Sequence, residues 1–253
     1  MENLKNNRID QALVDQSLVK SRSHAQKKIE AGCVFVRRSG KLIPIQKSSE
    51  ILEPEDEIIV RANDLDLFVS KGGLKLRAAC EHLKLNISGL YCLDIGISTG
   101  GFTDFLLQNG AKKIVGLDVG QGQLDSKIGD NPQVTHIEKV NCRHADQLAT
   151  ALSEEKFDLI VMDVSFISAT LIYPNLRKYL KENGKLLSLV KPQFELSPDA
   201  LNRKGLVKST KFYPAVEKKI KENLHNSGFQ VLDYFQSSEL GGDGNVEFFV
   251  FAK

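Results

Sequence analysis

The chain has 253 residues, of which 42% are hydrophobic and 26% are charged, and its formal net charge is +2. It contains no apolar run near the roughly 18 residues that a membrane-spanning helix needs, so a protein anchored in this way is excluded. The polar start MENLKNNRIDQ lacks the apolar core of a signal peptide, and we therefore expect a cytoplasmic protein. The length suits one large domain, or a medium and a small one.

The four cysteines are far apart in the sequence, and three of them lie in apolar surroundings. This distribution favours buried, reduced thiols over a disulfide or a metal site. The five histidines show no spacing typical of metal ligands, so we predict that the protein binds no metal.

The first 50 residues predict a small basic α+β unit. Ile9, Leu13, Val14 and Leu18 recur at helical spacing, and a second helix should run from Ser21 or Ser23 to Glu30. Residues 1–49 carry ten Lys or Arg against four acids, which suggests a polyanionic partner. A solvated helix surface would explain the same charge equally well.

Short β-like segments follow these two helices. They are VFV, KLIPI and EIIV at 57–60, with turns at Ser39-Gly40 and Pro54. We expect residues 1–60 to form one domain, and the polar stretch 61–67, RANDLDL, to form a linker.

Residues 68–253 alternate between strand-like and helix-like segments, which predicts a doubly wound α/β domain with a mostly parallel sheet. Strands are expected near 91–95, 113–118, 134–138, 158–163, 185–190, 230–235 and 246–251. The last two flank SSELGGDG and are close enough to form an antiparallel hairpin.

The glycine-rich stretch LDIGISTGGFTDFLL, residues 93–107, is the most informative part of the chain. An apolar strand leads into a glycine loop and then a helix, which allows the backbone to approach a ligand closely. A second apolar run, IVGLDVG, places Asp118 at the end of the next strand, where an acid can accept hydrogen bonds from ribose hydroxyls. The pattern indicates a site for a nucleoside cofactor.

The spacing of the loop distinguishes between such cofactors. A dinucleotide fingerprint is Gly-x-Gly-x-x-Gly, whereas this chain has Asp94-x-Gly96-x-x-x-Gly100-Gly101. The segment resembles the S-adenosyl-L-methionine signature of class I (Rossmann-like) methyltransferases, and a flavodoxin-like or NAD-binding fold is the alternative. The cofactor-binding residues that we predict are Asp94, Gly96, Ser98, Thr99, Gly100, Gly101, Phe102, Asp118 and Asn141.

Four charged residues stand where an apolar core would not place them: Lys75, Asp163, Lys191 and Glu247. Asp163 and Lys191 end apolar strands, on the same sheet edge as the glycine loop, where open α/β sheets bind ligands. Each alone could be an exposed charge, but their coincidence with the glycine loop predicts a catalytic cluster.

These four residues match, in order and context, the Lys-Asp-Lys-Glu tetrad of the FtsJ-like RNA ribose 2′-O-methyltransferases. The whole chain resembles the narrower TlyA (hemolysin A) family, in which an S4-like RNA-binding domain precedes an FtsJ-like domain. The matching phrases are SKGGLKL, LDIGISTGGFTD, DVGQGQLD, MDVSFIS, VKPQFE and the final GxGNVEFF. The chain departs from the family at Lys71, where Arg is usual, at Gln121 and Ser126, and in the linker.

The resemblance implies methylation of a ribose 2′-hydroxyl in ribosomal RNA, at a cytidine, with S-adenosyl-L-methionine as donor. Lys191 is expected to contact the 2′-oxygen, either as a base with a lowered pKa or as an ammonium that stabilises negative charge. Asp163 sets the charge of Lys191, and Glu247 holds Lys75 and the sugar. The RNA-binding residues implied are Arg8, Ser21, Arg22, Ser23, Lys27, Lys28, Lys71, Arg203 and Lys204.

Three other functions are compatible with parts of the sequence. A membrane-active haemolysin is disfavoured because the chain has neither a spanning helix nor long alternating barrel strands. A non-catalytic RNA-binding or assembly factor would have no need of the complete tetrad. A small-molecule methyltransferase would not explain the basic N-terminal unit. We expect ribosomal RNA or ribosomal subunits as partners; the sequence does not specify the oligomeric state.

Overall fold

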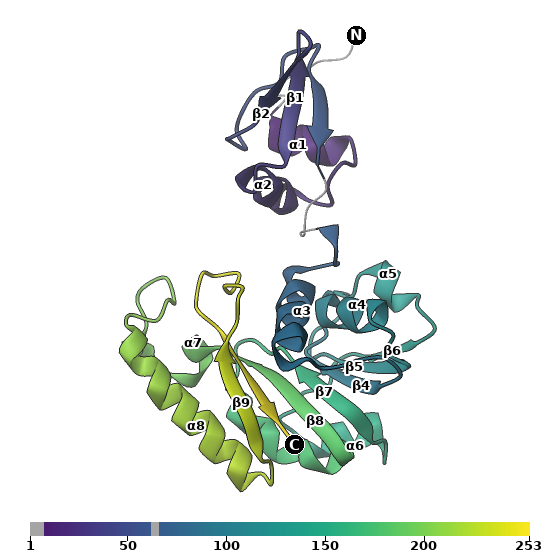
Figure 1. The fold of residues 1–253 in the computed structure, drawn as a ribbon, viewed down its shortest axis with the longest axis vertical. Coiled ribbons are helices and arrows are strands. Elements are labelled where there is room, and N and C mark those ends of the chain that lie inside the picture. The colour runs from purple at the N-terminus through teal and green to yellow at the C-terminus, as the bar shows by residue number, and fades with distance from the viewer. Residues whose placement is uncertain (1–7, 62–65) are drawn as a thin grey trace. The chain divides into compact units, whose positions relative to one another are not determined.

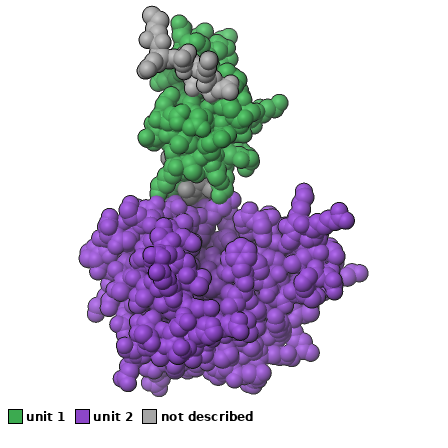
Figure 2. Space-filling view, turned by 180° about the vertical axis from the view of Figure 1, so that it is seen from behind, with its two compact units in different colours: residues 1–67 green, residues 68–253 purple. Residues whose placement is uncertain are grey.

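The computed structural model describes residues 8–61 and 66–253, and it divides into two compact units (Figure 1). Unit 1 comprises residues 1–67 and unit 2 comprises residues 68–253, as Figure 2 shows in two colours. Most of the expected linker, residues 62–65, lies outside the described residues.

Unit 1 combines two helices with a three-stranded antiparallel sheet in the order β2-β1-β3. Its elements are α1 (Ile9–Asp15), α2 (Arg22–Glu30), β1 (Val34–Arg38), β2 (Lys41–Pro44) and β3 (Glu57–Val60). Ile9 and Leu13 of α1 pack with Val34 of β1 in the core of the unit. The expectation that Leu18 shares this helix face is wrong, because α1 ends at Asp15 and the Leu18 side chain is exposed.

Unit 2 contains a seven-stranded sheet in the order β6-β5-β4-β7-β8-β10-β9. Its strands are β4 (Tyr91–Ile95), β5 (Lys113–Leu117), β6 (Val134–Ile137), β7 (Phe157–Met162), β8 (Leu180–Val190), β9 (Val231–Gln236) and β10 (Phe248–Ala252). Strands β6, β5, β4, β7 and β8 are parallel, and β10 runs antiparallel to both β8 and β9. The predicted α/β class, mostly parallel sheet and final antiparallel hairpin are confirmed.

Helices cover both faces of this sheet. They are α3 (Lys71–Leu83), α4 (Gly101–Gln108), α5 (Ser126–Gly129), α6 (Ala145–Leu152), α7 (Pro192–Glu195) and α8 (Tyr213–Asn226). Short 3₁₀ turns lie at Ala169–Leu171, Tyr173–Asn175, Arg177–Tyr179, Pro198–Ala200 and Thr210–Phe212. The five-residue strand β4 is buried on both faces, which explains why its sequence reads as a nearly continuous apolar run.

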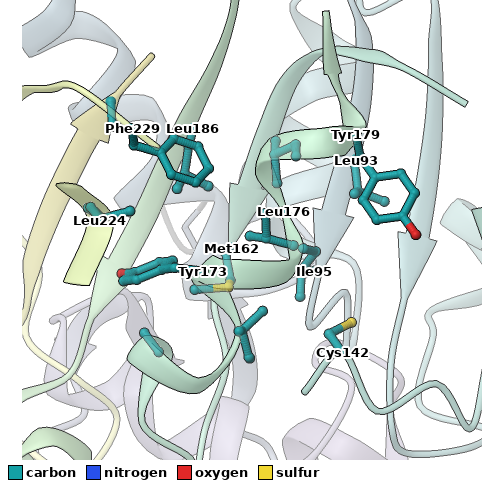
Figure 3. Packing of buried hydrophobic residues seen from close by; sticks show 14 of the residues in the cluster. Leu93, Ile95, Cys142, Met162, Tyr173, Leu176, Tyr179, Leu186, Leu224 and Phe229 are labelled. Atoms are coloured by element: carbon teal, nitrogen blue, oxygen red, sulfur yellow. The ribbon is translucent and has the colours of Figure 1, made fainter. Parts of the chain in front are cut away.

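Two hydrophobic cores hold the layers together. On one face, α6, α8 and the 3₁₀ turns pack against the sheet; Figure 3 shows Ile95, Met162, Tyr173 and Leu176 from this core. On the other face, α3 and α4 pack against the sheet through residues such as Leu76 and Leu106. With packing on both sides, the strand ends are fixed, and these ends position the candidate site.

The four cysteines are free and buried, as expected. Burial raises the pKa of the Cys80, Cys92 and Cys142 thiols to about 12, so these thiols stay protonated at neutral pH. Across residues 8–61 and 66–253, no helix combines the length and the apolar character needed to cross a membrane. The same residues contain no group of three or more His, Cys, Asp or Glu side chains arranged to hold a metal ion.

Candidate active site

The carboxyl ends of the parallel strands bring the candidate residues to one edge of the unit 2 sheet. Gly96 follows β4, Asp118 follows β5, Asp163 follows β7 and Lys191 follows β8. Because β4 pairs in parallel with β5 and β7, and β7 with β8, all four residues emerge on the same edge.

The turn after β4 depends on Gly96. Its φ is +82°, a region that favours glycine, and a Cβ here would lie 2.4 Å from the carbonyl oxygen of Asp163. The Gly96 amide donates to the carbonyl of Leu117 across the sheet, at 2.8 Å. The loop after β4 is therefore pressed against the end of β7, which only a residue without a side chain allows.

A pocket of about 520 Å³ opens beside this loop. Its walls are largely apolar and include Leu117, Val140 and Ile172, while Ser98, Asp118, Asn141 and Asp163 contribute polar groups. A concave, mostly apolar site with a few convergent polar groups is typical of small-molecule binding.

The carboxylate of Asp118 is held in place by two backbone amides. Ser98 N donates to Oδ2 at 2.8 Å, and Gly120 N donates to Oδ1 at 2.7 Å. Each carboxylate oxygen retains a second lone pair, so Asp118 can accept further hydrogen bonds from a diol in the pocket. A carboxylate in this state suits the ribose of a nucleoside, which is the ligand group that the sequence predicts for Asp118.

Lys191 lies against Asp163 and Ser165. Its Nζ is 2.6 Å from Asp163 Oδ1 and donates a hydrogen bond to Ser165 Oγ at 2.8 Å. Asp163 Oδ1 lies at ion-pair distance from Lys191 Nζ, but among the described residues no donor is aligned to form a hydrogen bond with it. Asp163 and Ser165 line the pocket, so Lys191 lies next to its wall, although Lys191, Lys75 and Glu247 are not themselves among the lining residues.

Lys75 and Glu247 form a second, buried ion pair. Lys75 comes from α3 and Glu247 immediately precedes β10, and Nζ lies 2.5 Å from Oε2. Burial raises the pKa of Glu247, while the charge of Lys75 opposes this shift. Lys191 and Asp163 also act electrostatically on Glu247. The two ion pairs therefore belong to one charge cluster.

The predicted cofactor residues fall into two groups. Gly96, Ser98, Asp118 and Asn141 line the pocket. Asp94, Thr99, Gly100, Gly101 and Phe102 are not among its lining residues.

Gly101 and Phe102, which do not line the pocket, instead take part in the packing around it. A Cβ on Gly101 would lie 2.1 Å from Ser70 Oγ, so this glycine allows α4 to pack against the start of α3. The Phe102 ring is buried in the core and stacks on Phe249 with ring centroids 6.4 Å apart. Phe102 therefore supports the sheet, and its ring does not face the pocket.

Two of the three arginines predicted to bind RNA, Arg8 and Arg22, are already engaged within unit 1. Arg8 and Arg22 both donate to the buried carboxylate of Asp10, at 3.0 Å and 2.8 Å. The Arg8 bond is the main cause that lowers the pKa of Asp10 to about 2. The Ser21 hydroxyl caps α2 by accepting the His24 amide. These residues organise the unit, and any RNA contact would use their remaining donors.

Lys28, which is also among the predicted RNA-binding residues, has a side chain that is only 1% exposed. Its Nζ pairs with Asp66 and donates to the carbonyl of Arg61 at 3.2 Å, so the ammonium is turned away from solvent. By contrast, Ser23, Lys27, Lys71, Arg203 and Lys204 are exposed.

Two residues of the pocket were not singled out from the sequence. Ser165 contacts Lys191, and Phe166 lines the pocket with a side chain 92% exposed and a φ of +63°. The ring centroids of Phe166 and Phe194 lie 5.3 Å apart, so the loop after β7 meets α7 there. The signal for Ser165 is its place just beyond a strand end. Phe166 gives no such signal, because an apolar residue in sequence is usually assigned to the core.

Comparisons with known proteins agree with this geometry. The FtsJ-like methyltransferase family matches residues 68–253. The 16S/23S rRNA (cytidine-2′-O)-methyltransferase TlyA of Mycobacterium tuberculosis is 32% identical over 97% of this chain and 89% of its own length.

Solved structures agree as well. One from Streptococcus thermophilus that carries a hemolysin name has a TM-score of 0.74 at 34% identity, and covers 97% of this chain and 87% of its own. The fibrillarin of Aeropyrum pernix, solved with bound S-adenosyl-L-methionine, has a TM-score of 0.52 at 15% identity, covering 80% of this chain and 81% of its own. The fibrillarin likeness shows the fold alone.

Proposed function

This chain belongs to the FtsJ-like methyltransferase family, together with the proteins named TlyA and hemolysin A, and we propose that it methylates a ribose 2′-hydroxyl of ribosomal RNA. The contact of Lys191 with Asp163 at the pocket wall is the observation that carries this proposal. A relative named as a cytidine-2′-O-methyltransferase supports cytidine as the target nucleotide. The same proposal implies a cytoplasmic location, where ribosomal RNA is found.

S-adenosyl-L-methionine is the cofactor of this class of enzyme, and when bound it supplies an electrophilic methyl group. The residues present fit it. Asp118 would accept hydrogen bonds from its ribose hydroxyls, and Asn141, which lines the pocket beyond β6, would contact the adenine edge. Gly96 has no side chain, so the backbone turn beside which the methionyl part would lie stays unobstructed.

Lys191 is proposed to act on the 2′-oxygen of the substrate. The proton of a ribose hydroxyl is held far above pH 7, so negative charge that develops on oxygen during transfer must be stabilised. The Asp163 carboxylate pairs with the Lys191 ammonium at 2.6 Å, and the hydrogen bond to Ser165 fixes the direction of the ammonium. We therefore assign Lys191 the role of stabilising and orienting the 2′-oxygen, with the proton lost to solvent. Lys75 and Glu247 would hold the sugar.

The exposed ring of Phe166 suits the base of the target nucleotide. A ribose can reach Lys191 only if its nucleotide leaves the RNA stack, and an unstacked base is commonly received by an aromatic side chain. Phe166 lies in the same loop as Asp163 and Ser165, so a base stacked on it would place its own ribose near Lys191.

Unit 1 is proposed to be the S4-like RNA-binding domain. Its exposed Lys27 and the guanidinium groups of Arg8 and Arg22 supply positive charge for the RNA backbone. Such contacts carry little sequence information, so this unit would add affinity while unit 2 selects the nucleotide.

Transfer of labelled methyl from S-adenosyl-L-methionine to ribosomal subunits from a strain without the gene tests this function. We expect label in RNA, and nuclease digestion of that RNA should release 2′-O-methylcytidine. Label on a base, or none at all although the cofactor binds, would contradict the proposal. The second result would favour a non-catalytic assembly factor.

A further inference from the structure

A short basic hairpin stands beside the charge cluster. Leu201 and Val207 form an isolated antiparallel bridge, and Asn202 closes the turn between them. The Asn202 side chain accepts from Lys204 N at 2.8 Å and from Leu206 N at 3.0 Å. The tip, which carries Arg203 and Lys204, therefore has a defined conformation.

One buried side chain anchors this hairpin. Asn245 is 3% exposed; its Oδ1 accepts from Val207 N at 3.0 Å and its Nδ2 donates to the carbonyl of Gly205 at 3.1 Å. Its Nδ2 also donates to Asp243 at 2.9 Å. Both the oxygen and the nitrogen of the Asn245 amide therefore bond to the hairpin, and the nitrogen also bonds to Asp243 of its own loop.

The anchor is continuous with the charge cluster. Asn245 lies two residues before Glu247, and Gly241 of the same loop packs so closely on the Glu247 carboxylate that a Cβ there would lie 2.7 Å from Oε1. Asp243 also accepts from Gln193, two residues after Lys191, at 3.0 Å. In Figure 1 the hairpin follows α7, and the loop between β9 and β10 lies beside it. The hairpin is therefore fixed relative to both Lys191 and Glu247.

The charge of the hairpin is unbalanced. Residues 201–211, LNRKGLVKSTK, contain four cations and no acid. Arg203 and Lys204 are exposed, and within the described part of the chain no ion pair joins either of them to an acid. An ordered tip with two unneutralised cations is suited to an anionic ligand. Because the tip lies next to the charge cluster proposed to act on a ribose, we expect that ligand to be the phosphate backbone of a nucleic acid.

We propose that the hairpin Leu201–Val207 binds the phosphate backbone of the RNA beside the target nucleotide, and that Asn245 is the positioning residue that sets its place relative to Glu247. This inference rests on the proposed function and adds to it how unit 2 holds the RNA strand. Arg203 offers a planar fork for a phosphate, and Lys204 a point charge.

The double variant Arg203→Ala/Lys204→Ala tests the first part in steady-state methylation of ribosomal RNA. We expect KM for RNA to rise about tenfold with kcat nearly unchanged, because phosphate contacts form equally in ground and transition states. The slope of log KM against log salt should fall by about 1 to 2, the value for two lost contacts. The matched control Lys112→Ala/Lys218→Ala removes two exposed cations elsewhere in unit 2 and should change neither quantity.

Asn245→Ala tests the second part. If Asn245 acts through the hairpin, this variant raises KM for RNA as the double variant does, and the triple variant shows no further increase. An unchanged thermal midpoint and cofactor affinity would show that the fold is kept. A triple variant in which the KM increase from Asn245→Ala adds to that of the double variant, or an Asn245→Ala variant that lowers kcat without raising KM, would overturn the positioning role.

Two other outcomes would overturn the hairpin assignment, and a third would overturn the proposed function on which it rests. Hairpin variants with the KM and salt slope of the control, while the wild type methylates ribosomal RNA, would remove the inference and leave the proposed function intact. A KM effect on assembled subunits that is absent on protein-free RNA would assign the hairpin to a ribosomal protein. No transfer by the wild type to either substrate would overturn the proposed function itself.

Discussion

At the scale of single residues, burial decides whether an acidic side chain is protonated or ionised. Asp94 is buried beneath the glycine loop, where Thr103 donates to its Oδ2 at 2.7 Å and its Oδ1 has no partner among the described residues. Desolvation raises the pKa of Asp94 to about 7, although the Thr103 hydrogen bond opposes this shift. Asp94 therefore supports the loop from within the core.

Replacing Asp94 by Asn should remove a pH dependence of stability. Between pH 4 and pH 7 the folded protein holds a proton on Asp94 that the unfolded chain has lost, so the free energy of unfolding falls as pH rises through this window, by up to about 1.4 kcal/mol per pH unit. Denaturant unfolding of cofactor-free protein at several pH values measures it. The wild type should lose stability relative to Asp94→Asn on going from pH 4 to 7, and parallel curves for the two proteins would contradict the account.

The charged residues of the candidate site and their two pairs, Lys191 with Asp163 and Lys75 with Glu247, were predictable, but the burial of an individual lysine elsewhere was not. An acid or lysine that ends an apolar run, such as Asp163 or Lys191, is visible in sequence because strands of a parallel sheet are buried. The burial of Lys28 could not be predicted in this way, since its sequence context matches that of the exposed Lys27. Only the packing of α2 decides that one is buried and the other is not.

At the scale of elements, the site depends on a close contact between the loop after β4 and the end of β7. The strands were predictable within a few residues because their apolar runs are short and are separated by turn residues. The early start of β8, at Leu180, was not, because the polar segment Lys181–Lys185 does not read as a strand. The contact of Gly96 with Asp163 depends on tertiary structure and could not be read from the glycine pattern alone.

Gly96→Ala should damage the site more than a comparable glycine elsewhere. Gly89 has a φ of +79°, close to that of Gly96, but nothing lies within 4 Å of its Cβ position. Gly89→Ala should cost only the backbone strain, of order 1 kcal/mol, whereas Gly96→Ala must also displace Asp163. Calorimetric cofactor binding and thermal unfolding measure this difference. Equal losses in the two variants would show that the close contact with Asp163 is unimportant.

At the scale of the whole molecule, the protein combines a small unit, whose first 49 residues carry an excess of cations, with a methyltransferase unit, and RNA binding and methyl transfer should separate in mutants. The adjacent lysines of α2 offer a test within one helix. Lys27 is exposed, whereas Lys28 is buried and paired with Asp66.

We expect Lys27→Glu to raise KM for RNA and to reduce the slope of log KM against log salt, because one phosphate contact is lost, while the unfolding transition stays unchanged. Lys28→Met should instead leave Asp66 without this partner and lower the stability of unit 1, by about 1 to 3 kcal/mol because Asp66 is partly exposed. Filter binding of RNA and thermal unfolding of the full chain distinguish the two effects. Loss of RNA affinity in Lys28→Met with unchanged stability would contradict this assignment.

The most direct test of the central claim is the single-turnover rate of methyl transfer by Lys191→Ala, measured with saturating RNA and alongside cofactor affinity. Because Lys191 is proposed to act on the 2′-oxygen and Asp118 to bind the cofactor, the account predicts a rate at least about 100-fold lower. Affinity for S-adenosyl-L-methionine should stay close to that of the wild type. A variant that transfers methyl at nearly the wild-type rate would contradict the assignment of the catalytic cluster.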